Sequence, residues 1–113
     1  MKQALVTVRY TLTGDGEKFR NDMDKTAALI VETPGLLWKI WGFEPELGFG
    51  LSACLFDSEA AAYAFVGGPV IKALRDRTDV SDVIFEMAGV DQGLSAMTGA
   101  GPALTVRGIA AAA

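Results

Sequence analysis

The sequence predicts an α+β fold in which strands and helices follow one another in the order β-α-β-β-α-β. Three observations predict it. Apolar residues alternate along the chain, or fill both sides, in four short segments, and they recur at helical spacing in two longer ones. The length of 113 residues gives room for one domain with one core, but not for a catalytic domain beside a separate cofactor domain.

The first strand is predicted from Gln3 to Leu12, because every second residue there is apolar. The residues that would share its buried face are Ala4, Val6, Val8, Tyr10 and Leu12. Glycines and an aspartate at positions 13–16 end the strand. From about Asp15 to Glu32 the spacing predicts an amphipathic helix that runs back along the sheet. Its apolar residues are Phe19, Met23, Ala27 and Ile30.

A second strand, Leu36 to Phe43, is apolar on both faces and carries both tryptophans of the chain. The turn at 44–46 would return the chain into a third strand, Phe49 to Phe56. The side of the second strand that carries Trp38 is wholly apolar, so we expect Trp38 to face the helices. Trp41 shares its side with Lys39, and we therefore expect Trp41 to face a partner subunit.

A second helix is predicted after the Asp-Ser-Glu sequence at 57–59, which supplies a cap and acidic residues for the first turn. The Gly-Gly-Pro sequence at 67–69 interrupts this helix before apolar residues resume. A fourth strand, Asp79 to Val90, is again apolar on both faces. We expect residues 1–98 to form the single domain. Residues 99–113 would be a C-terminal tail that is either flexible or packed on the partner subunit.

This order of elements is that of the ferredoxin-like fold, a four-stranded antiparallel sheet with two helices on one face. The opposite face of the sheet would be left without a cover, although three of the strands place hydrophobic residues there. An exposed apolar patch of that size is typical of an interaction surface. Since most soluble oligomers are closed homodimers, we expect a homodimer formed through this sheet face.

The composition argues against several classes of function. A net charge of -4 and a pI near 4.6 disfavour nucleic acid as a partner. The sequence has no His, the commonest transition-metal ligand, so no metal is expected. Cys54 is the one cysteine, and we expect it to be a small buried hydrophobic residue. No stretch has the composition of a membrane span or a signal peptide, which predicts a cytoplasmic protein with no membrane partner.

The sequence PGLLWKIW at 34–41, followed by LFDSEAA at 55–61, resembles the YdhR-like monooxygenases of the dimeric α+β barrel superfamily. The resemblance covers roughly Ala4 to Met97. It implies a homodimer whose sheets face each other, with a small apolar pocket in each subunit between the sheet and its helices. It also implies the oxidation of activated aromatic compounds by molecular oxygen without metal, flavin or nicotinamide, so no cofactor is expected.

Several aromatic and polar residues are candidates for the site. Trp38 could offer a flat wall or an indole N–H donor to an aromatic ligand. Tyr10 and Tyr63 are the phenols that could hydrogen-bond a substrate oxygen or assist a proton transfer. Phe65 could line the pocket, and Arg9 could stabilise a developing enolate. We take Trp38 and Tyr63 as catalytic candidates and Tyr10, Phe65 and Arg9 as substrate-binding candidates. Each also has a structural interpretation, as a core residue or, for Arg9, as a surface residue.

The expected function is cofactor-independent oxygenation of a small aromatic or phenolic compound. The substrate would lose a proton, and its carbanion would reduce oxygen directly in a pocket that excludes water. The base stays open between a carboxylate and a tyrosinate. Two alternatives also stay open: a dimeric protein that binds an apolar small molecule without catalysis, and an isomerase on the same fold.

Overall fold

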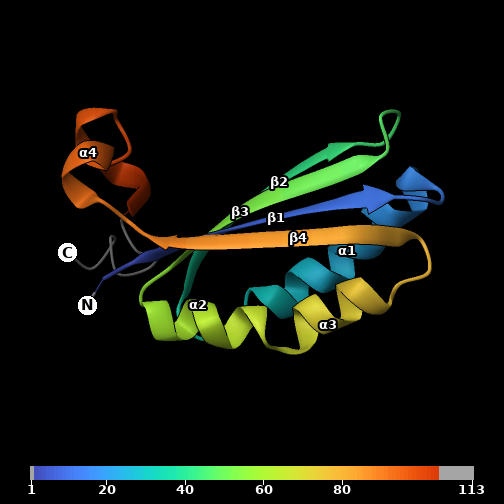
Figure 1. Ribbon diagram of the computed structural model, residues 1–113, viewed down its shortest axis with the longest axis horizontal. Coiled ribbons are helices and arrows are strands. Elements are labelled where there is room, and N and C mark those ends of the chain that lie inside the picture. The colour runs from blue at the N-terminus through green and yellow to red at the C-terminus, as the bar shows by residue number, and fades with distance from the viewer. Residues whose placement is uncertain (1, 105–113) are drawn as a thin grey trace.

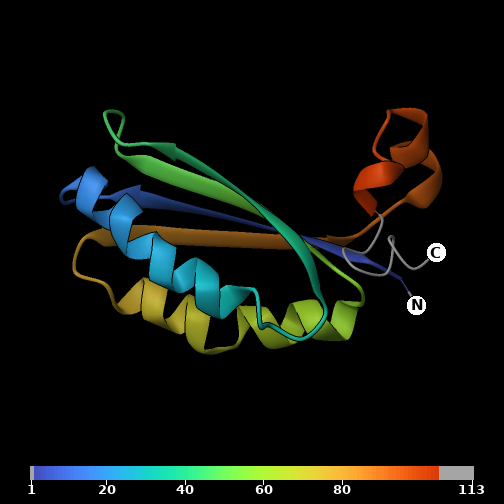
Figure 2. The ribbon, with the colours of Figure 1, turned by 180° about the vertical axis from the view of Figure 1, so that it is seen from behind.

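The computed structural model describes residues 2–104 as one antiparallel sheet with a layer of helices on one face (Figures 1 and 2). The strands are β1 (Ala4–Leu12), β2 (Leu36–Glu44), β3 (Phe49–Phe56) and β4 (Val80–Gly89), in the spatial order β2-β3-β1-β4. The helices are α1 (Gly16–Ile30), α2 (Glu59–Val66), α3 (Pro69–Asp76) and α4 (Gln92–Met97), followed by a 3-10 turn, η1 (Pro102–Leu104). The predicted β-α-β-β-α-β order and the ferredoxin-like α+β class are confirmed.

The core lies between the sheet and helices α1, α2 and α3. β1 shows the predicted alternation, since its apolar residues from Ala4 to Leu12 are buried at every second position. α1 packs on this surface through Phe19, Met23 and Ile30, which recur at helical spacing. Asp15 caps α1, because its carboxylate accepts hydrogen bonds from the first backbone N–H groups of the helix.

The second helical segment is divided where the sequence predicts an interruption. α2 begins after Ser58, whose hydroxyl accepts a hydrogen bond from the backbone N–H of Ala61. Gly67 and Gly68 end α2, and Pro69 is the first residue of α3. The division lets α2 cover one end of the sheet and α3 the other (Figure 1).

β2 contains a β-bulge near its start. Leu36 pairs with Phe56 and Trp38 pairs with Leu55, so that Leu37 is an extra residue with no partner of its own in β3. Because side chains alternate along a strand, one extra residue reverses the face to which every later side chain points.

The tryptophans therefore occupy the faces opposite to those predicted. Trp41 lies opposite Ser52, on the helix side of the sheet, and packs against the core. Trp38 lies on the other face, where its indole Nε1 donates a hydrogen bond to the carbonyl oxygen of Ala103. The prediction that Trp38 faces the helices and Trp41 faces a partner is wrong, since the alternation from Leu36 does not continue through the bulge.

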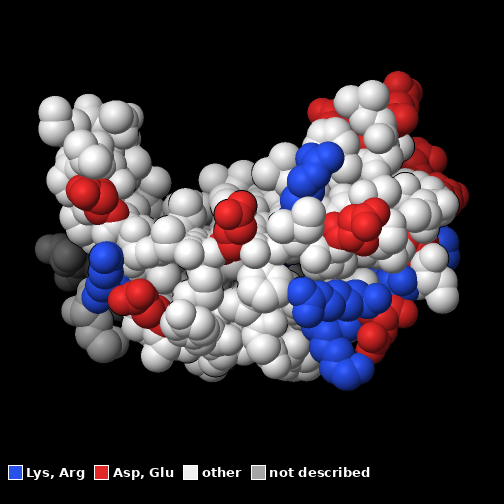
Figure 3. Space-filling model, in the orientation of Figure 1, with Lys and Arg blue, Asp and Glu red and all other residues white. Residues whose placement is uncertain are grey.

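The sheet face away from the helices is apolar and largely exposed. Its exposed large side chains are Leu5, Ile40, Leu51 and Ile84. Figure 3 shows that this side of the molecule is hollowed between α4 and the β2–β3 turn, and that the surface there is mostly uncharged. The predicted uncovered face is thus present in the single chain.

One end of that face is covered by the segment after β4. Both ribbon views place α4 on the side of the sheet away from the main helices. The side-chain amide of Gln3 donates a hydrogen bond to the carbonyl oxygen of Leu104 at 3.0 Å, which ties η1 to the start of β1. The rest of the predicted tail, 105–113, lies outside the described residues. None of the helices in the described part of the chain is long and apolar enough to cross a membrane.

Candidate functional site

A cavity of about 570 Å³ lies between the sheet and helices α1 and α3. Val8 and Trp41 contribute to its sheet side, and Ile30 and Leu74 contribute to its helix side. The lining is mainly apolar, and the volume falls within the range of about 300–1,000 Å³ that is typical of small-molecule sites. The position agrees with the pocket that the family resemblance implies.

Tyr10 supplies a phenol to the cavity. Its ring lies over Gly50, which is opposite to it in the sheet, and a Cβ atom at Gly50 would lie 2.5 Å from the Tyr10 hydroxyl oxygen. Burial raises the pKa of Tyr10 to about 12. The phenol is therefore protonated at neutral pH, which favours a hydrogen-bonding role over that of a tyrosinate base.

Lys39 lines the same cavity and is the residue that sequence reasoning missed. Its Nζ lies 4.2 Å from the ring centroid of Trp41 and 5.9 Å from that of Phe65. No carboxylate within residues 2–104 forms an ion pair with it. Burial lowers the pKa of Lys39, and the nearby Cys54 opposes this effect. The signal in the sequence was a single cation in an otherwise apolar strand.

Ser52 and Cys54 follow one another on the same face of β3. Ser52 is 4% exposed and lines the cavity, and its hydroxyl has no hydrogen-bond partner in the described part of the protein. Cys54 is buried in the core with a free thiol, as the sequence predicts. Burial raises the pKa of this thiol, which keeps it in its less reactive protonated form.

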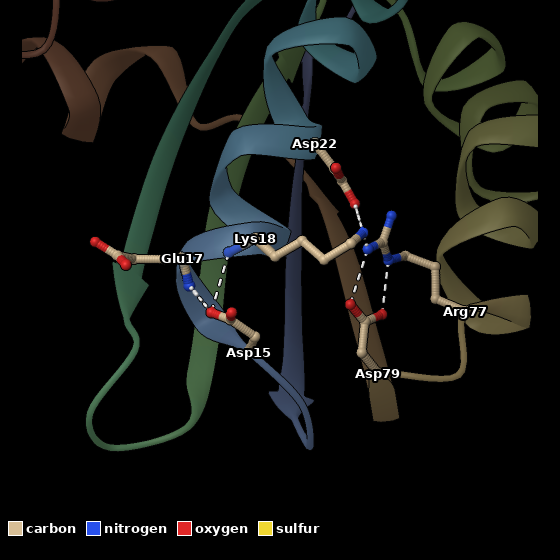
Figure 4. Close-up of polar contacts among 6 residues, drawn as sticks. All are labelled: Asp15, Glu17, Lys18, Asp22, Arg77 and Asp79. Carbon is tan, nitrogen blue, oxygen red and sulfur yellow. Dashed lines mark hydrogen bonds and ion pairs between the residues drawn. The ribbon is translucent and has the colours of Figure 1, made fainter.

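Arg77 contributes a second cation to the cavity wall, but its charge is already neutralised (Figure 4). Its guanidinium donates to both carboxylate oxygens of Asp79 at 2.8 Å and to Asp22 at 2.9 Å. These bonds raise the pKa of Arg77, chiefly through Asp79, and lower the pKa of Asp79. The cluster joins α1 to the loop before β4 and has the character of a structural ion-pair network.

The structure separates the residues that were predicted to form the site. Tyr10 lines the cavity, whereas Phe65 is buried in the core beside Phe56, with the ring centroids 5.3 Å apart. Tyr63 is 68% exposed on α2. Arg9 lies on the opposite face of the sheet, where its guanidinium carbon is 4.3 Å from the ring centroid of Phe49. The roles predicted for these residues and for Trp38 stay predictions.

Side chains that could bind a metal do not gather in the described part of the chain. Within residues 2–104, there is no group of three or more His, Cys, Asp or Glu side chains that could hold a metal ion. The charged residues that line the cavity in the described part of the chain are Glu32, Lys39 and Arg77.

Solved structures with the same fold include an oxygenase. SnoaB from Streptomyces nogalater, a cofactor-independent oxygenase, is 18% identical over 81% of this chain and 96% of its own, with a TM-score of 0.65. NE2512 from Nitrosomonas europaea, a protein of unknown function, is 18% identical over 80% of this chain and 90% of its own, with a TM-score of 0.67. At these identities the matches show the fold alone.

Sequence comparison places the chain in a family. No curated protein matches it. The family model described as "Putative mono-oxygenase ydhR" matches residues 5–101, which is most of the chain and includes the PGLLWKIW sequence at 34–41. The resemblance seen in that sequence is thus confirmed, and the chain belongs to the YdhR mono-oxygenase family.

Proposed function

We propose that this protein is a monooxygenase that oxidises a small aromatic or phenolic compound with molecular oxygen and without a cofactor. The observation that carries the proposal is the mainly apolar cavity of about 570 Å³ between the sheet and the helices, with the protonated phenol of Tyr10 on its wall. Membership of the YdhR family and the fold shared with SnoaB, a cofactor-independent oxygenase, support it.

The proposed reaction converts an activated methylene group, such as that of an anthrone, into a carbonyl. A base removes one proton, and the electron pair left on carbon reduces oxygen as a C–O bond forms. The peroxide anion takes the proton back from the base, and the resulting hydroperoxide loses water, which breaks the O–O bond and leaves one oxygen atom as the carbonyl and the other in water. The substrate supplies all the electrons. The apolar walls exclude water from the carbanion, and Tyr10 can donate a hydrogen bond to the substrate oxygen.

Oxygen uptake with a panel of anthrones and hydroxylated naphthalenes tests this proposal. We expect uptake of one oxygen molecule per carbonyl formed. Tyr10→Phe should lower kcat/KM by about tenfold, the effect of one hydrogen bond to a developing charge. The matched variant Tyr63→Phe should have little effect, and a larger loss there would favour the sequence-based role of Tyr63.

Two other outcomes would contradict oxygenation. Tight binding of the panel without oxygen uptake would identify a small-molecule binding protein. Turnover that continues without oxygen would identify an isomerase.

We also propose that the protein is a homodimer formed through the exposed sheet face. Burying the side chains of Ile40, Leu51 and Ile84 against a second copy would remove apolar surface from water, and Arg9, which lies between Leu51 and Ile84 in the sheet, would stand at the same interface. Leu51→Lys should shift the protein towards monomer in sedimentation velocity, whereas Ala28→Lys on the exposed side of α1 should not. A wild-type protein that is monomeric at micromolar concentration would rule out this arrangement.

A further inference from the structure

We propose that the cavity binds its aromatic ligand as an oxyanion, held by the ammonium of Lys39 and the hydroxyl of Ser52. The inference deepens the proposed function and rests on it for the cavity as the binding site. It names the substrate class: a planar aromatic compound with an acidic oxygen, such as a phenol, an enol or a carboxylic acid.

The charges of the cavity wall favour an anionic ligand. Among the described residues, the charged groups that line the cavity are Glu32, Lys39 and Arg77. Arg77 is already paired with two carboxylates, and Glu32 is exposed to solvent. Lys39 forms no ion pair within residues 2–104, so its charge is free to pair with a ligand.

A cation in apolar surroundings costs free energy unless it has a partner. The Nζ atom of Lys39 lies 4.2 Å from the ring centroid of Trp41. This cation–π contact offsets part of that cost and keeps the ammonium at the cavity. A bound oxyanion would supply the missing partner. The same indole face, which lines the cavity, offers a flat wall for the aromatic ring of the ligand.

The buried hydroxyl of Ser52, which has no hydrogen-bond partner within the described residues, points independently to the same ligand. A hydroxyl that is buried without a partner costs about 1–3 kcal/mol, so such groups are rare outside binding sites. Lys39 lies opposite Cys54, and Ser52 lies opposite Trp41, which makes Lys39 and Ser52 diagonal neighbours on one face of the β2–β3 pair. One oxygen of a ligand between them could accept a hydrogen bond from both.

The pair also supplies the base that the sequence left open. When the ligand arrives with its proton, the O–H bond breaks, the proton passes to Nζ of a neutral Lys39, and the electron pair stays on the ligand oxygen. When it arrives ionised, Lys39 is already protonated. Both routes give the same ammonium–oxyanion pair. In a phenolate or an enolate, conjugation then carries the electron pair to the carbon that meets oxygen, whereas a carboxylate would be bound without this step.

Binding of matched probes in the absence of oxygen tests the inference. One pair is a nitronaphthol, which is ionised at mildly alkaline pH, and its neutral methyl ether. The other pair is naphthoate and naphthamide, which distinguishes carboxylates from phenolates as the acceptable oxyanion. Calorimetry should show that wild-type protein binds at least one anion about ten- to hundredfold more tightly than its neutral partner, as a charged hydrogen bond provides.

Variants assign that preference to residues. Lys39→Met keeps the length of the side chain and should abolish the preference while leaving the affinity for the neutral probes unchanged. Lys39→Arg should retain most of the preference for the anion. Ser52→Ala should reduce that preference about fivefold, which corresponds to the loss of one ordinary hydrogen bond. Lys72→Met, at a lysine whose side chain is 76% exposed on α3, is the matched control and should bind like the wild type.

Three results would overturn the inference: no preference for either anion in the wild type, an unchanged preference in Lys39→Met, or no binding of any probe. Binding of the neutral probes by Lys39→Met shows that the variant is folded with its cavity intact. Oxygen uptake is measured separately. An anion preference that depends on Lys39, without any uptake, would support the anion site and contradict the oxygenase.

Discussion

Alkaline pH should destabilise this protein through Tyr10. Burial raises the pKa of Tyr10 from its ordinary value of 10.0 to about 12, so the folded chain holds the phenolic proton more tightly than the unfolded chain does. A group whose pKa is raised on folding contributes stability that is fully present below its unfolded pKa. That stability is lost as the pH rises from 10.0 through about 12.

The size of the effect follows from the two pKa values. A difference of one pKa unit corresponds to ~1.4 kcal/mol, so the change from 10.0 to about 12 corresponds to about 2.7 kcal/mol once the pH exceeds both values. At pH 11, midway between them, linkage gives a loss of about 1.4 kcal/mol. Tyr10 is only 5% exposed, so solvent screening should reduce this value little.

Urea unfolding of the wild type and of Tyr10→Phe, at about pH 8 and about pH 11, measures the effect. The wild type should lose about 1.4 kcal/mol more than the variant between the two conditions. Other groups that titrate in this range, such as Lys39 and Cys54, are present in both proteins and cancel in the comparison. Tyr63→Phe, at an exposed phenol, should behave like the wild type. Equal losses in the wild type and in Tyr10→Phe would refute the reasoning.

Three further substitutions test the packing around the cavity. Gly50→Ala should destabilise the protein by about 1–3 kcal/mol, because its Cβ would meet the Tyr10 hydroxyl at 2.5 Å. Gly101→Ala, with no atom within 4 Å of its Cβ, is the control, and equal unfolding midpoints for the two would contradict the contact. Phe19→Ala should cost about 3–5 kcal/mol in urea unfolding, since Phe19 is 0% exposed, whereas Leu47→Ala, at a 75% exposed turn residue, should change little. Lys39→Met should raise stability at neutral pH by about 0.5–2 kcal/mol, because it removes a desolvated cation that forms no ion pair within residues 2–104. Because burial lowers the pKa of Lys39, the unfolded chain holds that proton more tightly, and the gain should shrink as the pH rises towards 10.5. Comparison at each pH cancels the titrations of Tyr10 and Cys54, and a gain that does not vary with pH would argue that Lys39 is not desolvated.

The order of elements could be predicted because its signals are local. In β1 every second residue is buried, and in α1 the apolar residues Phe19, Met23 and Ile30 recur at helical spacing, so each pattern specifies both the element and its inner face. The interruption at 67–69 could be predicted for a similar reason, since Pro69 can begin a helix but cannot lie in its interior.

The candidate site could be predicted only in part. Tyr10 was found because it lies in a strand with one clear inner face. The sequence does not reveal Lys39 as a cavity residue, because lysine is among the residues least often buried and its presence therefore predicts an outer face of β2. The unpaired hydroxyl of Ser52 depends on what surrounds it in the folded protein, and a single segment of sequence does not contain that information.

The bulge at Leu37 links the error in the fold prediction to the chemistry of the site. Without the extra residue, the alternation from Leu36 would place Trp38 and Ile40 towards the helices and Lys39 on the exposed sheet face. The cavity would then lose the cation that lacks an ion-pair partner within residues 2–104, and the exposed sheet face would gain a further cation beside Arg9. With the bulge, Lys39 and Trp41 both reach the cavity and Ile40 stays on the exposed face. A single inserted residue near the start of an edge strand therefore determines both the polarity of the proposed ligand and the apolar character of the proposed dimer surface.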